Sequence, residues 1–304
     1  MKETYKNYLS PIDEYSNLPF RVLCQKYSAE ATCVPLINST AISRNPDKTD
    51  TIDAKEEEKN IGIQIVGNVP EELANCAKTI EKKFPFVKWL NINCGCPSVR
   101  TMHCGGGSAM LNHPQKIYDA VKRIQSSITI PISVKMRVKD NLENTIKIAK
   151  GIEEAGADKI ILHGRSASQG YSGKANWDLI KKVKEAVSIP LVGNGDLQNA
   201  REGEEKINAG FCDSYMIARA AMNNPKVFQN KNLETDKERA RIFFQYMEIC
   251  EKFEYKLTHK DIKLKAMNFV SGSVDASKKR LEISRTKEIN EINKIFIDLE
   301  SQEN

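Results

Sequence analysis

The residues most able to do chemistry stand together at positions 91–97, which read NINCGCP. They follow an apolar run that ends at Leu90 and precede three consecutive glycines at 105–107. A thiol in a polar turn after a strand lies at the rim of a sheet, where it can reach a ligand. The pattern therefore predicts a reactive cysteine at this turn.

The same segment could instead suggest a metal site, because Cys94, Cys96, His103 and Cys104 lie close together in the sequence. Structural zinc sites prefer two or more residues between paired cysteines. The spacing therefore favours a site without metal.

Polar residues also occur within or at the end of other apolar runs. Lys135 lies within ISVKMR and His163 ends KIILH. A lysine inside such a strand needs an acceptor-rich or anionic partner, unless it only reaches solvent from an edge. A histidine at a strand end is either a satisfied core residue or part of a site. Both residues are candidates for ligand binding.

The elements that must position these residues alternate between strand and helix. β-Branched runs predict strands at 32–37, 61–66, 87–93, 132–137, 159–163, 191–194 and 214–218, with a weaker first strand at 8–10. Amphipathic periodicity predicts helices at 18–27, 70–83, 114–125, 142–155, 177–187 and 199–209. Eight such units within about 230 residues predict a (β/α)8 TIM barrel, whose usual length is ~250 residues. A doubly wound open sheet is the alternative, but polar residues at nearly every strand end favour a barrel with one shared mouth.

After Pro225 the sequence loses its strand signals. Apolar residues recur at three- and four-residue spacing from Leu233 to Leu299. We therefore expect residues 1–230 to form the barrel and residues 231–304 to form a small C-terminal helical bundle.

The loops after the last two strands are typical of a phosphate site. Residues 193–196 read GNGD, and Arg219 follows the eighth strand. TIM barrels often bind phosphate at these loops through backbone N–H groups, and an arginine adds a charged donor. No Gly-x-Gly-x-x-Gly follows a strand, so a Rossmann dinucleotide site is not expected.

The composition favours a cytoplasmic protein. No stretch approaches the ~20 apolar residues that span a bilayer, and the N-terminus lacks an apolar signal segment. The 8 cysteines lack the dense spacing of a disulfide scaffold, so we expect reduced thiols. The net charge of +6 is a mild bias toward polyanions.

Taken in order, these motifs resemble the tRNA-dihydrouridine synthase family, flavin enzymes that reduce selected uridines of tRNA. The resemblance runs from about Leu9 to Phe228. It is carried by SPID at 10–13 with Phe20-Arg21, IQIVGN at 63–68, NCGCPS at 93–98, VKMR at 134–137, HGR at 163–165, YSGKANW at 171–177, GNGD at 193–196, and Ala218-Arg219 with Asn224-Pro225.

The resemblance implies FMN at the mouth of the barrel, with NADPH or NADH as its reductant. It implies that Pro11, Ile12 and Asp13 contact the isoalloxazine ring through the backbone. Gln64 would hydrogen-bond the ring, and Lys135 would lie at its N1/O2 edge. The ribityl-phosphate tail and its surroundings would be held by His163, Asn194, Gly195, Asp196, Ala218 and Arg219. Ala218 stands where the family commonly has glycine.

Cys96 matches the general acid of the family. Hydride passes from flavin N5 to uracil C6, and a proton reaches C5 from the opposite face. A thiol, with an ordinary pKa of about 8.5, stays protonated near neutral pH and still gives up its proton. The 104–107 loop is expected to close over the base. Asn93, Arg165 and Tyr171 are expected to contact the uridine or its tRNA.

The resemblance also makes the C-terminal helices the tRNA-binding domain. We expect Ile262, Ala266 and Phe269 to face the core of that domain, which leaves nearby lysines for phosphates. A stacked uridine must be extruded to reach the flavin. No metal or membrane partner is expected, and the protein is expected to be a monomer. The basic candidates are Lys256, His259, Lys260, Lys263 and Lys265, followed by Lys278, Lys279 and Arg280.

Two other functions stay open. A flavin reductase of free pyrimidines, such as a dihydroorotate dehydrogenase, would share the barrel and FMN, but it has no use for a basic helical appendage. A non-catalytic RNA-binding protein or chaperone would retain an inactive barrel. The presence of both Cys96 and Lys135 argues against that second alternative.

Overall fold

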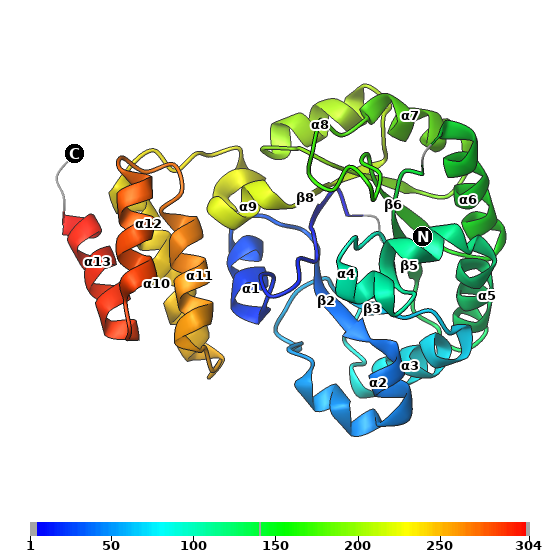
Figure 1. Ribbon diagram of the computed structural model, residues 1–304, viewed down its shortest axis with the longest axis horizontal. Coiled ribbons are helices and arrows are strands. Elements are labelled where there is room, and N and C mark those ends of the chain that lie inside the picture. The colour runs from blue at the N-terminus through cyan, green and yellow to red at the C-terminus, as the bar shows by residue number, and fades with distance from the viewer. Residues whose placement is uncertain (1–4, 140, 302–304) are drawn as a thin grey trace.

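Within residues 5–139 and 141–301, which the computed structural model describes, eight parallel strands form one sheet that curves into a barrel (Figure 1). The strands pair in the order β1-β8-β7-β6-β5-β4-β3-β2. An isolated parallel bridge between Tyr8 and Ala31 brings β1 to the start of β2. The strands are β1 (Asn7–Leu9), β2 (Thr32–Asn38), β3 (Ile61–Val66), β4 (Trp89–Cys94), β5 (Ile132–Arg137), β6 (Lys159–His163), β7 (Leu191–Asn194) and β8 (Ser214–Ile217).

Helices connect the strands and cover the outside of the barrel. Asparagines at 17, 38, 141, 176 and 199 cap α1, α2, α6, α7 and α8, and each side chain accepts a hydrogen bond from the backbone N–H three residues later. In the described ranges no helix combines the length and the apolar character needed to cross a bilayer. The helices are α1 (Leu18–Lys26), α2 (Ser39–Arg44), α3 (Pro70–Lys83), α4 (Val99–His103), α5 (Pro114–Gln125), α6 (Leu142–Glu154), α7 (Trp177–Ala186), α8 (Ala200–Asn208) and α9 (Arg219–Asn223), with 3-10 turns η1 (Pro46–Thr51), η2 (Gly107–Asn112) and η3 (Pro225–Gln229).

The TIM barrel predicted from the sequence is confirmed. The strand predicted at 87–93 begins later, at Trp89, because the N–H of Val87 closes a turn onto the carbonyl of Phe84 (3.0 Å). Periodicity does not predict α2, α4 or α9, since helices of five or six residues complete too few turns to show it.

After η3 the chain forms four further helices, α10 (Asp236–Lys252), α11 (His259–Phe269), α12 (Ala276–Arg285) and α13 (Ile289–Ser301). Figure 1 shows them beside the barrel, next to α1. Capping boxes begin α10 and α11, with Thr235 paired to Glu238 and Thr258 paired to Asp261. The helical periodicity predicted after Leu233 is therefore confirmed.

The apolar faces of these four helices share a core with the barrel. That core joins Phe20 of α1 to Phe243 of α10, and Phe243 stacks on Phe296 of α13 with ring centroids 3.9 Å apart. A second core lies between the sheet and helices α3, α5, α6 and α7. The division at residue 230 stays a prediction, because side chains from both sides of it pack in one core.

Gly193 in β7 links the barrel wall to the loop that follows it. A Cβ at Gly193 would lie 2.5 Å from the ring of Trp177, and the Trp177 Nε1–H donates to the carbonyl of Gly195 (3.1 Å). Gly193→Ala is expected to lower the free energy of unfolding by about 1–3 kcal/mol, because the indole must shift. Urea denaturation measures this change. An unaltered midpoint would show that the indole moves without cost.

Candidate active site at the mouth of the barrel

The carboxyl ends of the strands surround a cavity of about 650 Å³. Most of the site residues proposed from the sequence line it, although they come from loops far apart in the chain. Arg165, Lys260 and Lys263 do not line it. The proposed residues that do are Pro11, Ile12, Asp13, Gln64, Asn93, Cys96, Lys135, His163, Tyr171, Asn194, Gly195, Asp196, Ala218 and Arg219.

The Cys96 thiol is held at this mouth by a compact loop. The Asn93 side chain, at the end of β4, accepts hydrogen bonds from the N–H groups of Gly95 (3.0 Å) and Cys96 (2.9 Å). The Cys96 carbonyl accepts from the N–H of Ser108 (2.9 Å), and its thiol donates to Thr101 Oγ1 (3.7 Å). These bonds fix both the backbone and the sulfur.

Gly107 allows the loop to close this tightly. Its φ is +59°, and a Cβ there would lie 2.6 Å from the Cys96 carbonyl oxygen. A larger residue would strain the backbone and push the Cys96 loop out of place. The glycine cluster noted in the sequence therefore supports the thiol from the neighbouring segment.

A chain of buried amides extends from the Cys96 loop into the barrel. Asn93 Nδ2 donates to Gln64 Oε1 (2.8 Å), and Gln64 Nε2 donates to Asn91 Oδ1 (2.7 Å). Asn91 Nδ2 then donates to Ser133 Oγ (2.7 Å). Such a satisfied network is rigid. Asn93 lines the cavity and bonds protein partners through both of its side-chain polar atoms, and its expected contact with the substrate stays a prediction.

Lys135 projects from β5 into the cavity. Its ammonium donates to Asn194 Oδ1 (3.3 Å), and within the described residues it forms no ion pair with a carboxylate. Burial, with help from Arg137, lowers the pKa of Lys135 to about 8. A cation held this way favours an anionic or acceptor-rich ligand.

Arg137 also lines the cavity, although no role is predicted for it from the sequence. Its Nε donates to the carbonyl of Gly95 (2.8 Å), and its Nη1 donates to the carbonyls of Ser166 (2.9 Å) and Gly170 (3.2 Å). It thereby ties the Cys96 loop to the loop after β6. Its position two residues after Lys135 places both side chains on one face of β5, and this spacing is the signal that identifies it.

Next to Lys135 and Arg137, the wall of the cavity contains further charged groups and a neutral histidine. Asp196 accepts from Arg165 Nη1 (2.6 Å) and from Arg219 Nη2 (3.0 Å). Burial opposes ionisation of Asp196, but hydrogen bonds from Arg165 and Ala175 and the two arginine charges lower its pKa. Burial, reinforced by Lys135, Arg137 and Arg165, lowers the pKa of His163 to about 2, so its imidazole is neutral.

Arg165 does not line the cavity, and its expected contact with the uridine or its tRNA stays a prediction. Its side chain is buried and donates to the carbonyls of Ser172 (3.2 Å) and Gly173 (2.6 Å) as well as to Asp196. The guanidinium therefore supports the cavity wall from behind. Tyr171 is 68% exposed at the rim, and the Arg219 guanidinium carbon lies 4.9 Å from its ring centroid.

The basic residues of the C-terminal helices are only partly available to a polyanion. Lys260 is exposed and lines a separate groove of about 360 Å³ between the barrel and α11. The Lys263 ammonium donates to the carbonyls of Ser284 (2.9 Å) and Thr286 (2.7 Å) at the end of α12. Lys265 is buried, because it shares a face of α11 with Ile262 and Phe269. The expectation that this lysine lies free for phosphates is wrong.

The cysteines of the 94–104 segment differ in their exposure to solvent. Cys94 packs in the core, whereas Cys96 lines the cavity and Cys104 is exposed. All 8 cysteines are free thiols. Among the described residues no group of three or more metal-binding side chains comes together.

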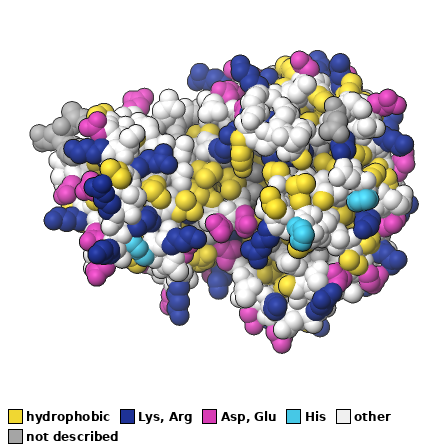
Figure 2. Space-filling view, viewed as in Figure 1, with side chains coloured by type: hydrophobic (Ala, Val, Ile, Leu, Met, Phe, Trp, Pro, Cys, Tyr) yellow, Lys and Arg dark blue, Asp and Glu magenta, His cyan; other side chains and the backbone are white. Residues whose placement is uncertain are grey.

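Exposed apolar side chains surround the mouth. Val99 and Met102 on α4 are 84% and 38% exposed, and basic Arg100 and His103 alternate with them. Val69, in the loop after β3, is also exposed. Figure 2 shows hydrophobic side chains gathered over the centre of the barrel, where Figure 1 places α4. The rim thus combines apolar surface with positive charge.

The chain is similar in sequence or fold to several known proteins. The family model described as Dihydrouridine synthase (Dus) matches residues 8–296. A relative from Aquifex aeolicus (strain VF5), named a probable tRNA-dihydrouridine synthase, is 31% identical over 273 residues, covering 87% of this chain and 86% of its own. The tRNA-dihydrouridine synthase B of Pasteurella multocida (strain Pm70) is 31% identical over 226 residues, covering 73% of this chain and 67% of its own. Among solved structures, histamine dehydrogenase from Rhizobium sp. 4-9 has a TM-score of 0.55 and 14% identity, over 80% of this chain and 49% of that chain, which supports the fold alone.

The buried charge of Lys135 is expected to lower the free energy of unfolding of the ligand-free protein. At pH 7 the ammonium is charged and desolvated, so Lys135→Met is expected to raise the free energy of unfolding by about 1–3 kcal/mol. At pH values between the pKa of about 8 in the folded protein and the ordinary value of 10.5, the unfolded chain binds more protons at Lys135 than the folded chain does. The stability of the unsubstituted chain therefore rises with pH across this window, and the advantage of the variant shrinks.

Urea denaturation of both proteins at pH 7 and near pH 10 measures this difference. An advantage of the same size at the two pH values would contradict the lowered pKa.

Proposed function

Because the chain belongs to the dihydrouridine synthase family, whose members are oxidoreductases, we propose that it reduces the C5=C6 bond of specific uridines in tRNA. The proposal includes FMN as cofactor, NADPH or NADH as reductant, and a cytoplasmic monomer as the active form. The observation that carries it is the Cys96 thiol, fixed by Asn93 at the mouth of a cavity that also contains Lys135.

The residues present fit an FMN. A cavity of about 650 Å³ suits a ligand of this size. Lys135 offers a cation for the electron-rich edge of the ring, and Arg219 offers one for the phosphate. At Gly195 φ is +138°, and a Cβ would lie 2.5 Å from the Cβ of Ala175. Only glycine fits this position without strain.

Ala218 lines the cavity beside Arg219. Its φ is −120°, outside the left-handed region that favours glycine. The neutral imidazole of His163 can hydrogen-bond hydroxyl groups without repelling Lys135 or Arg219. When bound and reduced, FMN would supply the hydride for uracil C6.

The protein itself supplies the proton. The Cys96 thiol would give its proton to C5, and the contact with Thr101 Oγ1 (3.7 Å) restrains the position of the sulfur. Donation to C5 leaves a thiolate, which takes a proton from solvent before the next turnover. Lys135, on the neighbouring strand, can stabilise negative charge on a ligand in the same cavity.

The rim suits an unpaired stretch of RNA. A uridine that leaves its stack exposes the neighbouring bases, which Val99, Met102 and Tyr171 can cover. Arg100 and Arg219 lie beside these side chains and can contact phosphates. These exposed apolar and basic groups support a polynucleotide as the substrate in preference to a free pyrimidine.

Cys96→Ala is expected to retain FMN and tRNA binding but to lose at least ~100-fold in dihydrouridine formation, because the proton donor is removed. Mass spectrometry of tRNA digested after incubation with NADPH measures the product. Cys104→Ala is the matched control, since that thiol is exposed outside the cavity, and it should stay active. Full activity in Cys96→Ala would overturn the assignment.

The double variant Val99→Ser, Met102→Ser is expected to slow the reaction on folded tRNA by about tenfold, through lost base contacts. Reduction of bound flavin by NADPH, followed by its absorbance, should not change. The double variant Val274→Ser, Leu281→Ser removes exposed apolar side chains from α12 and the turn before it and serves as the comparison. A rim variant that is as fast as the unsubstituted chain on folded tRNA would show that the rim does not bind RNA.

A further inference from the structure

Lys265 is a buried lysine with unusual surroundings. It lies on α11 and is 1% exposed. Its Nζ lies 3.4 Å from the ring centroid of Tyr15, 4.3 Å from that of Phe20 and 5.6 Å from that of Tyr246. Within the described residues no carboxylate forms an ion pair with it. Aromatic faces and one carbonyl therefore replace water around this ammonium.

That carbonyl belongs to Tyr15, to which Lys265 Nζ donates a hydrogen bond. Tyr15 is part of a tight turn at residues 12–16. The N–H groups of Tyr15 (3.1 Å) and Ser16 (2.9 Å) donate to the carbonyl of Ile12, and the N–H of Ile12 donates to Ser16 Oγ (2.7 Å). The turn thus moves as one unit.

The outer side of this turn is a wall of the active-site cavity. Ser10, Pro11, Ile12 and Asp13 line the cavity. The Tyr15 hydroxyl also donates to the carbonyl of Met222 (2.7 Å), another lining residue. A shift of the Tyr15 carbonyl would therefore displace the side of the cavity that is proposed to face the flavin ring.

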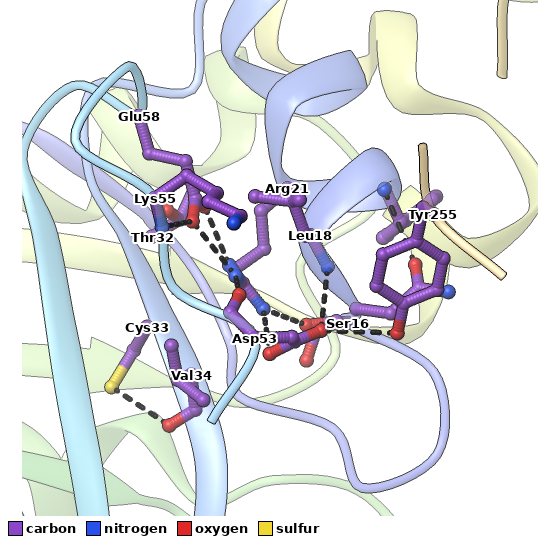
Figure 3. Close-up of polar contacts among 12 residues, drawn as sticks. Ser16, Leu18, Arg21, Thr32, Cys33, Val34, Asp53, Lys55, Glu58 and Tyr255 are labelled. Atoms are coloured by element: carbon purple, nitrogen blue, oxygen red, sulfur yellow. Dashed lines mark hydrogen bonds and ion pairs between the residues drawn. The ribbon is translucent and has the colours of Figure 1, made fainter. Parts of the chain in front are cut away.

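A second buried cation holds the next carbonyl of the same turn. Arg21 Nη1 donates to the carbonyl of Ser16 (2.8 Å), and Figure 3 shows Arg21 between Glu58 and Asp53. Arg21 pairs with Glu58 (2.7 Å) and Asp53 (3.2 Å), so its charge is compensated inside the barrel domain. Tyr255, from the segment before α11, also donates to Asp53 (3.2 Å).

The two basic residues differ in what they contribute. Arg21 has its own carboxylates, whereas burial without a carboxylate partner among the described residues lowers the pKa of Lys265, and an apolar residue of similar length would fill the same space at a lower desolvation cost. Stability alone does not explain a lysine at this position. An apolar side chain could not donate the hydrogen bond that Lys265 makes from α11 to the Tyr15 carbonyl.

We propose that Lys265 is a positioning residue through which the C-terminal helices hold the 12–16 turn in place and thereby set the affinity of the cavity for FMN. This inference rests on the proposed function for the identity of the ligand. The contact between Lys265 and the turn is independent of that identity.

The test compares Lys265→Met, which keeps the length but loses the donor, with Lys265→Gln, which keeps a neutral N–H donor. Lys294→Met, an exposed lysine on α13, is the control. FMN is titrated into each ligand-free, full-length protein and binding is followed by quenching of flavin fluorescence. Lys265→Met should raise the Kd about tenfold, and Lys265→Gln should recover part of the affinity. The thermal midpoint of ligand-free Lys265→Met should equal or exceed that of the unsubstituted chain.

Amide hydrogen exchange supplies a second readout without ligand. Peptides that cover residues 10–18 should exchange faster in Lys265→Met than in Lys294→Met. An unchanged Kd with unchanged exchange, or a thermal midpoint that falls together with the affinity, would overturn the positioning role. If the unsubstituted chain binds no FMN but exchange at the turn accelerates in Lys265→Met, the cofactor assignment fails and the contact between α11 and the turn stands.

Discussion

The hydrogen bonds of one side chain, that of Asn93, determine the geometry of the mouth. Its carbonyl oxygen holds the N–H groups of Gly95 and Cys96, and its amide group holds Gln64. The sulfur-bearing loop and a polar group on the neighbouring strand are therefore fixed relative to each other by one amide. The network continues through Asn91 to Ser133, so the arrangement is anchored in the barrel interior. A thiol acts as a selective proton donor only if it is held in one place, and this network provides that restraint.

The positive charges around the cavity favour electron-rich or anionic ligands. Lys135 and Arg137 enter from one strand and Arg219 enters from the end of another, while Asp196 is already engaged by two arginines. The lowered pKa values of Lys135 and His163 have a common origin in burial among cations. Such a site stabilises electron-rich ligands, and it keeps its histidine neutral so that it does not add to the positive charge.

Much of the barrel and its mouth could be predicted from the sequence, because strand and helix periodicities are local and parallel strands bring their carboxyl ends together. Cys96, Lys135 and the GNGD loop were found in this way. The contacts of Asn93, Arg165 and Lys265 could not be predicted from local patterns, because each of these side chains bonds partners in other segments. Lys265 also shows that a lysine in an amphipathic helix can belong to the buried face, since its ammonium finds a carbonyl and aromatic rings of the barrel. The strand alternation that identified Lys135 also predicts that Arg137, two residues later, lies on the same face of β5.

The proposed mechanism requires that Cys96 delivers a proton to a uracil that lies between the thiol and the flavin. An experimental structure of the chain with FMN and a substrate tRNA would give the distance from Cys96 Sγ to uracil C5. We expect a separation of about 3.5 Å, with the sulfur on the face of the base turned away from the flavin. A sulfur on the flavin side of the base, or a uridine bound outside the cavity, would contradict it.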